Sequence, residues 1–164
     1  LFIGCRAPFT GICTNRPFGT YDNVGLARAR GAEFAVTMRP TDSLSVQVTH
    51  GYVDSRNRAA GTANFDRRLP RRPENATSLL VDYRWPFGLE TGFTLTNVSA
   101  AFENAANTLR LPGYTLGDIR AMMPLGKKLE LTARIENLFD ESYETALNFG
   151  QMPRAGYVGV RVKM

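Results

Sequence analysis

Short and long connections alternate strictly along this chain, and each joins two segments in which apolar and polar residues alternate. The three short connections are tight turns that contain proline, at Pro40-Thr41-Asp42, Pro86-Phe87-Gly88 and Pro124-Leu125-Gly126. The three long ones are polar and run from about Asn57 to Asn75, Phe102 to Pro112 and Asp140 to Pro153. Transmembrane β-barrels are connected in this way, with brief periplasmic turns and extended outer loops. The pattern therefore predicts an all-β, antiparallel transmembrane barrel.

Seven segments have the period-two alternation that predicts β-strands. In residues 129–136, apolar side chains at the odd positions alternate with Glu, Thr and Arg at the even positions. The odd positions are expected to face lipid, and the even positions a water-filled lumen. Long strands suit a barrel, whose tilted strands cross ~30 Å of hydrocarbon. The expected strands lie at about 24–39, 43–56, 79–85, 93–96, 113–123, 129–136 and 154–164.

Average composition neither requires nor excludes a membrane barrel. The sequence is 43% hydrophobic with a mean hydropathy of −0.22, and no run reaches the ~20 apolar residues of a membrane helix. Only every second residue of a barrel strand faces lipid, so a barrel resembles a soluble protein in these averages. A soluble antiparallel sandwich also alternates polar and apolar residues. It has no reason, however, to keep a strict order of short and long connections.

The net charge of +5, from 20 Lys and Arg against 15 Asp and Glu, does not indicate a nucleic-acid partner. The basic residues are scattered over strands and loops, without an aromatic-and-basic recognition motif. An enzyme is not expected, because the sequence has no nucleophile with a base, no His cluster and no glycine loop for phosphate. No cofactor or metal site is expected either. His50, the only histidine, falls at an apolar-facing position, where a packed or interfacial role is expected.

An arginine-rich segment is the best candidate for binding. Six arginines lie between residues 56 and 72 with one acid, Asp66, so the segment carries six minus one, or +5. Arginine pairs bidentately with phosphate and carboxylate groups, so an anionic substrate or a lipopolysaccharide phosphate would be attracted to this outer loop. A solvated loop that is kept soluble by its charge explains the pattern equally well. The candidate anion-binding residues are Arg56, Arg58, Arg67, Arg68, Arg71 and Arg72.

Cys5 and Cys13 lie eight positions apart in a segment rich in Gly and Pro, which precedes the first strand and is expected on the outer side. An oxidising compartment allows them to close a small loop, so a disulfide is expected. A metal site is not indicated, because no histidine lies near these cysteines.

The C-terminal residues resemble a known family. The run Asn137-Leu138-Phe139-Asp140 is followed by Tyr143-Glu144 within residues 133–145, and a final strand follows at residues 156–164. Together they are similar to the end of a TonB-dependent outer-membrane receptor, whose penultimate strand carries this signature. The upstream segments that look similar to the cobalamin-receptor branch are 31–34 and 52–57.

The resemblance implies the C-terminal portion of a barrel of about 22 strands around a plug, in the bacterial outer membrane. Residues 1–23 then form an extracellular loop segment, and residues 24–164 form the last barrel strands. The chain begins at Leu1 without an initiator Met, a basic region or an apolar signal segment. It is therefore expected to be an excised piece of a longer protein.

The function that the resemblance implies is the uptake of a scarce metal-containing nutrient, cobalamin or a ferric siderophore, with TonB-coupled energy. The implied partners are the TonB energy-coupling complex, reached through a plug outside this chain, the barrel assembly machinery, lipopolysaccharide or other outer-membrane lipid, and the metal-chelate substrate. A passive pore or a structural barrel is the alternative. A plug with a coupling box in the full gene would decide between them.

Two features near the C-terminus have structural interpretations. The final strand resembles a barrel assembly signal, a Gly followed at fixed spacing by two apolar residues. Asn137 and Asp140 are expected to hydrogen-bond backbone groups where the sixth strand turns into an outer loop. The residues of the assembly signal are Tyr157, Gly159, Val162 and Met164, of which Met164 departs from the aromatic residue that usually ends the family.

Overall fold

The structure is a computed structural model that describes residues 2–3, 5, 7–8, 11–18, 20–21 and 25–162. Near the N-terminus, β1 (Phe2–Ile3) pairs with β2 (Thr20–Tyr21), and the 3-10 turn η1 (Gly11–Cys13) lies between them in the sequence. Within the described residues, no helix is long and apolar enough to cross a bilayer.

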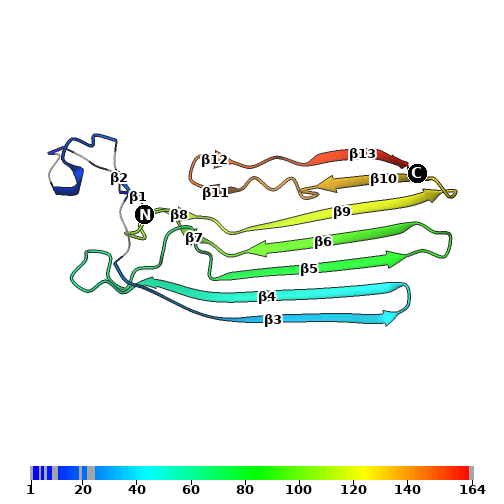
Figure 1. The fold of residues 1–164 in the computed structure, drawn as a ribbon, viewed down its shortest axis with the longest axis horizontal. Helices are drawn as coiled ribbons and strands as arrows, with labels where there is room; N and C mark the ends of the chain where they lie inside the picture. The colour runs from blue at the N-terminus through cyan, green and yellow to red at the C-terminus, as the bar shows by residue number, and fades with distance from the viewer. Residues whose placement is uncertain are drawn as a thin grey trace.

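One antiparallel sheet contains seven strands, and their order in the sheet follows their order in the sequence (Figure 1). β3 and β13 form its two edges. This architecture confirms the predicted all-β antiparallel fold and the number of strands. The strands are β3 (Ala27–Thr41), β4 (Leu44–Asn57), β5 (Asn75–Arg84), β6 (Glu90–Val98), β9 (Tyr114–Leu125), β10 (Leu129–Glu136) and β13 (Ala155–Val162).

Two of the predicted turns are shorter than expected, because the strands continue through their prolines. Pro40 and Thr41 belong to β3, and Pro124 and Leu125 belong to β9. A proline is tolerated at the end of a strand, where the hydrogen-bonded ladder does not need its missing N–H. The predicted strand residues that lie outside the described residues are Val24, Lys163 and Met164.

The long connections contain backbone pairing that residue alternation did not predict. β7 (Ala101–Phe102) pairs with β8 (Arg110–Leu111), and β11 (Glu144–Ala146) pairs with β12 (Phe149–Gly150). The connection between β4 and β5 forms an isolated bridge with the end of β4, between Arg68 and Arg56. These pairings are too short to show a period of two in the sequence, yet they give each long connection a defined path.

The pairing register places the predicted apolar residues of neighbouring strands on one face of the sheet. Leu131 lies opposite Met123 on one side and Val160 on the other. Phe93 lies opposite Val81. Residues directly opposite each other in an antiparallel pair project to the same face. The alternation in the sequence is therefore consistent from strand to strand.

The apolar face is not covered by a second layer. Leu111 is the only buried hydrophobic residue in the described part of the chain. The apolar side chains of the sheet are open instead, with Phe34, Val158 and Val160 exposed by 58%, 79% and 66%. A soluble sandwich would bury such residues between its two sheets. An open apolar face is the expected outer surface of a lipid-embedded barrel.

The opposite face is polar and carries ion pairs between strands. Arg120 on β9 reaches across Gly92 on β6 to pair with Asp82 on β5. A Cβ atom at Gly92 would lie 2.5 Å from the Arg120 Cζ, so the glycine leaves room for this pair. This face has the character of a wet lumen, as the sequence predicted.

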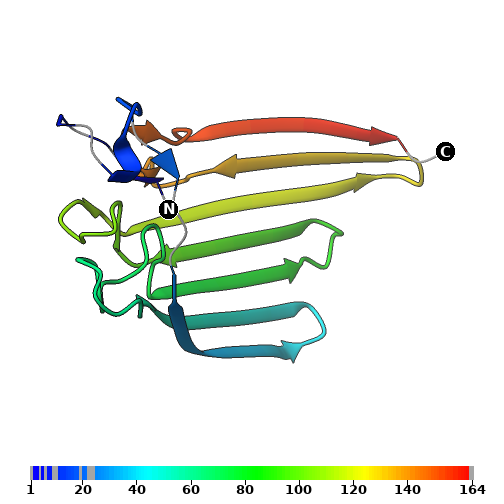
Figure 2. The ribbon, with the colours of Figure 1, turned by 60° about the vertical axis from the view of Figure 1, so that its left-hand side comes forward.

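The two ends of the sheet differ. The short turns and the end of β13 lie at one end, and the long connections lie at the other, together with the described N-terminal residues (Figures 1 and 2). Near the short-turn end, the rings of Tyr83 and Trp85 meet edge to face at 4.9 Å. Aromatic side chains gather at both membrane interfaces of outer-membrane barrels, so Tyr83 and Trp85 mark the membrane border at this end. Short turns face the periplasm in such barrels, so the short-turn end is the periplasmic end.

Candidate functional site

The long connections meet at the outer end of the sheet, and hydrogen bonds join two of them. The Arg71 N–H donates to the Phe102 carbonyl at 2.7 Å. The Arg68 N–H donates to Asn107 Oδ1 at 2.8 Å, and Asn107 Nδ2 donates back to the Arg68 carbonyl at 3.0 Å. The connection between β4 and β5 is thereby fixed against the connection between β6 and β9.

Glu103 joins the third long connection to these two. Its carboxylate accepts hydrogen bonds from the Arg71 guanidinium and, at 3.2 Å, from the Leu147 N–H. The hydrogen bonds from Arg71 lower the pKa of Glu103, burial opposes them, and the bond from Leu147 lowers it further. Glu103 is therefore ionised at neutral pH and acts as a shared acceptor between three segments.

Four of the six predicted anion-binding arginines form ion pairs within the protein. Three of their four partner acids lie outside residues 56–72, so the charge of +5 counted for that segment overstates the local charge. Six arginines less these four acids leave +2. The pairs are Arg56 with Asp54 at 2.8 Å, Arg58 with Asp66 at 2.9 Å, Arg68 with Glu74 at 2.6 Å, and Arg71 with Glu103.

Arg67 and Arg72 are the members of the set that stay available. Both are exposed, and neither side chain makes a hydrogen bond or ion pair with any described residue. They lie in the connection between β4 and β5, at the outer end of the sheet. The structure thus narrows the predicted cluster of six to two exposed guanidinium groups beside four that are paired.

Two arginines that the sequence analysis did not select, Arg28 and Arg30, lie on the outer part of β3. Arg28 is opposite Arg56 and Arg30 is opposite Asp54, so all four share one face of the sheet. It is the face that becomes apolar toward the periplasmic end. The alternation of residues 32–38 extends to positions 28 and 30, which is the signal that could have identified them.

The Asn137-Leu138-Phe139-Asp140 run forms the predicted turn out of β10. Asn137 Nδ2 donates to the Glu141 carbonyl, and Asn137 Oδ1 accepts from the Glu141 N–H, both at 2.9 Å. Asp140 Oδ1 accepts from the Arg154 N–H at 3.0 Å. Asn137 and Asp140 have φ angles of 51° and 55°, a region in which Asn and Asp are enriched. The predicted hydrogen bonding to the backbone is confirmed.

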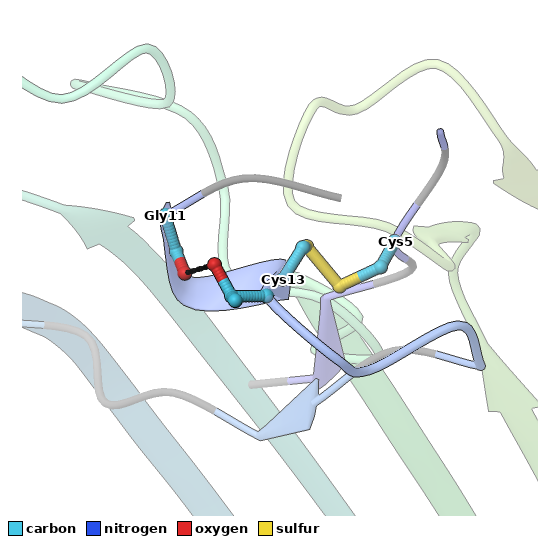
Figure 3. Close-up of a disulfide and its surroundings, with 4 residues drawn as sticks. Cys5, Gly11 and Cys13 are labelled. Carbon is cyan, nitrogen blue, oxygen red and sulfur yellow. Dashed lines mark hydrogen bonds between the residues drawn. A yellow bond between two sulfur atoms is a disulfide. The ribbon is translucent and has the colours of Figure 1, made fainter. Parts of the chain in front are cut away.

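Cys5 and Cys13 are joined by a disulfide, with the sulfur atoms 2.01 Å apart (Figure 3). The second cysteine ends the turn η1, and the Thr14 hydroxyl donates to the Gly11 carbonyl at 2.9 Å. Gly11 has a φ of 59°, which glycine adopts without a steric penalty. A covalent bond and a tight turn therefore hold this small loop together.

Three residues of the predicted assembly signal lie on β13, and Met164 lies outside the described residues. The Arg134 guanidinium lies 4.4 Å from the centre of the Tyr157 ring. A Cβ atom at Gly159 would lie 3.0 Å from Thr132 Oγ1, so this position favours glycine for packing reasons too. Val162 is 63% exposed on the apolar face.

Within the described residues, no group of three or more His, Cys, Asp or Glu side chains is arranged to hold a metal ion. His50 lies on the apolar face, opposite Phe34 and Thr77. Its Nδ1 is 2.8 Å from the Thr77 hydroxyl oxygen. This contact satisfies one ring nitrogen and gives the histidine a packing role.

Comparisons with known proteins agree with this architecture. A family model described as TonB dependent receptor-like, beta-barrel matches residues 5–138. The Ferrioxamine B receptor of Salmonella typhimurium strain LT2 is 28% identical over 148 residues, which cover 85% of this chain and 21% of that receptor. The Vitamin B12 transporter BtuB of Photobacterium profundum is 28% identical over 144 residues, which cover 86% of this chain and 22% of that protein.

A solved structure shares the fold. BauA, the ferric preacinetobactin receptor from Acinetobacter baumannii, aligns with a TM-score of 0.75 at 22% identity, over 89% of this chain and 23% of that chain. The chain thus spans about a fifth of the length of the relatives that it matches. These relatives are receptors and transporters. Because the family model matches most of the sequence, the chain belongs to the TonB-dependent receptor-like β-barrel family of the bacterial outer membrane.

Proposed function

We propose that this chain forms the C-terminal strands of an outer-membrane receptor that takes up a ferric siderophore or cobalamin with TonB-coupled energy. The observation that carries the proposal is the sheet itself, which has an apolar face toward lipid and a charged face toward a lumen, and six of its seven strands lie within the family match. The proteins at 28% identity are a ferrioxamine B receptor and a vitamin B12 transporter. Both cargoes are metal chelates, and their metal is part of the substrate.

The rest of the barrel and the plug belong to the remaining length of such a receptor. An open sheet leaves unpaired backbone groups at β3 and β13, which lipid cannot satisfy. Further strands that pair with these edges would close the barrel. The TonB energy-coupling complex would act through the plug, and the barrel assembly machinery would read the final strand, at Tyr157, Gly159, Val162 and Met164. Residues 1–23 would form an extracellular segment.

Within this function, the exposed Arg67 and Arg72 would attract anionic or phosphate-bearing cargo to the outer mouth. Each exposed charge contributes only about 0 to 1 kcal/mol, so the pair acts on capture more than on selectivity. The neighbouring Arg56, Arg58, Arg68 and Arg71 would act mainly as supports, because carboxylates of the protein already neutralise them.

The test uses the full receptor in cells with and without TonB. Uptake of a labelled anionic ferric siderophore and of labelled cobalamin is measured for the wild type, for R67Q/R72Q, and for K127Q/K128Q. Lys127 and Lys128 are a matched control, because they are also two exposed cations but lie in a periplasmic turn.

We expect uptake of one cargo to require TonB. R67Q/R72Q should lower its initial rate a fewfold and weaken the dependence of that rate on salt, while K127Q/K128Q should have no effect. Uptake that proceeds equally well without TonB would support a passive pore instead. If R67Q/R72Q transports like the wild type, the loop is only a solvated surface.

A further inference from the structure

On the lipid-facing side of the β3–β4 hairpin, the side chains change from apolar to cationic at one position along the strands. Phe34 and Tyr52 lie on this face, and the next positions toward the outer end carry Arg30 opposite Asp54 and Arg28 opposite Arg56. Opposite residues share a face, so these charges project outward with the apolar residues and not into the lumen.

The position of this change along the membrane normal matches the outer border of the apolar band of a membrane barrel. Near the periplasmic end, Leu44 lies opposite Tyr83, whose ring meets the ring of Trp85. Tyr52 is eight residues farther along β4, since 52 minus 44 is 8. At ~3.3 Å per residue and a tilt of ~40°, that distance corresponds to ~20 Å along the membrane normal. An apolar band is ~25 Å tall and is bounded by aromatic side chains, so Tyr52 fits its outer border.

Arg28 and Arg30 therefore lie at the level of the lipid headgroups. Successive residues on one face of a strand are ~7 Å apart, so the two guanidinium groups can reach the same or adjacent headgroups. Both residues are exposed, and neither side chain makes a hydrogen bond or ion pair with a described residue. Arg28 is repelled by Arg30 and Arg58 and attracted by Asp54 and Asp66.

The acids near this patch are already engaged. The Arg56 Nε–H is shared between the two carboxylate oxygens of Asp54, at 2.8 and 2.9 Å, and Asp66 pairs with Arg58 at 2.9 Å. Arg28, Arg30, Arg56 and Arg58 less Asp54 and Asp66 leave a charge of +2 in the surroundings of Arg28. An anion between Arg28 and Arg30 would relieve their mutual repulsion and would gain bidentate hydrogen bonds.

We propose that Arg28 and Arg30 bind a phosphate group of lipopolysaccharide in the outer leaflet, at a site on the lipid-facing side of the β3–β4 hairpin. The charge and the position favour a lipid headgroup over soluble cargo, because the side chains project outward from the barrel at the headgroup level. The inference rests on the outward face and the membrane position and does not depend on which cargo the receptor carries.

The test uses the purified full receptor in detergent, with lipopolysaccharide binding followed by native mass spectrometry and by the thermal shift that the lipid causes. The probes are lipopolysaccharide with its lipid A phosphates, the same lipid after enzymatic dephosphorylation, and inorganic phosphate. The variants are R28Q/R30Q, R28K/R30K, the outer-loop comparison R67Q/R72Q and the charge-matched control K127Q/K128Q.

R28Q/R30Q is expected to weaken binding of the phosphorylated lipid by about three- to tenfold, and dephosphorylation should weaken wild-type binding equally. R28K/R30K should bind with intermediate affinity, because it keeps the charge but loses the bidentate geometry. K127Q/K128Q should bind like the wild type, and any loss of affinity in R67Q/R72Q should be smaller than the loss in R28Q/R30Q.

The site would be contradicted if R28Q/R30Q bound lipopolysaccharide as well as the wild type does. It would also be contradicted if R28Q/R30Q, R67Q/R72Q and K127Q/K128Q lost equal lipopolysaccharide affinity, or if inorganic phosphate at millimolar concentration competed with the lipid. The last result would indicate a site for soluble anions. Cargo uptake by R28Q/R30Q should stay at the wild-type level, so a failure of this proposal is distinguishable from a failure of the proposed transport function. If R28Q/R30Q does not fold, R30Q alone and R28K/R30K give the same comparison.

Discussion

The Arg71 guanidinium donates hydrogen bonds to the Glu103 carboxylate across a sequence separation of 32 residues. Glu103 also accepts from the Leu147 N–H, 44 residues farther along. One carboxylate therefore connects all three long connections at the outer end of the sheet.

The Glu103 contact should make the outer connections sensitive to acid. The pKa of Glu103 is lowered in the folded protein, first of all by the hydrogen bonds from Arg71. Its stabilising contribution is therefore complete above the ordinary value of 4.5 and is lost as the pH falls through the lowered pKa. Because Arg71 is 55% exposed, we expect less than about 1 kcal/mol.

Amide hydrogen exchange of residues 101–111 and 141–150 in the full receptor, from neutral pH to well below 4.5, measures this effect. Protection should fall in acid for the wild type. E103Q should be less protected at neutral pH and should change little with acid. If the wild type and E103Q have the same pH profile, another group controls these connections.

The contact between Phe139 and Gly117 should be sensitive to added volume. A Cβ atom at Gly117 would lie 2.6 Å from the Phe139 ring, and the Leu138 N–H donates to the Gly117 carbonyl at 2.6 Å. G117V should therefore lower the free energy of unfolding by about 1 to 3 kcal/mol, and F139A should recover part of that loss. The free energies of unfolding of the wild type, G117V, F139A and the double variant measure the coupling between the two positions. Strictly additive effects would show that the ring does not limit residue 117.

The two faces of β10 should respond differently to a new charge. Leu131 lies on the apolar face opposite Met123 and Val160, whereas Thr132 lies on the polar face opposite Met122 and Gly159. L131R should cost about 2 to 4 kcal/mol near the midplane of the bilayer, and T132R should be mild. Folding titrations of the full receptor in lipid vesicles measure the loss of stability in each variant. Equal tolerance of the two variants would contradict the assignment of the faces.

Local sequence patterns were sufficient to predict the sheet. The period of two in residues 129–136 is a property of neighbouring residues, because successive side chains of a strand point to opposite faces. The prolines are less informative: Pro40 and Pro124 indicate turns by residue type but lie inside strand ends. The role of Asn137 was also predictable, because its partner Glu141 is only four residues farther along, whereas the Asp140 partner Arg154 lies 14 residues away, at the other end of the long connection.

The site depended on the tertiary structure. The sequence by itself determined that arginines gather between residues 56 and 72, but not that Glu74 and Glu103 neutralise two of them. Ion pairing is set by which connections meet in space, and that depends on the register of strands far apart in the sequence. The register also placed Arg28 opposite Arg56, on the lipid-facing side. The sequence therefore determined strands, faces and topology, because these are short-range periodicities, and only the tertiary structure decided which charges are paired and which are available to a partner.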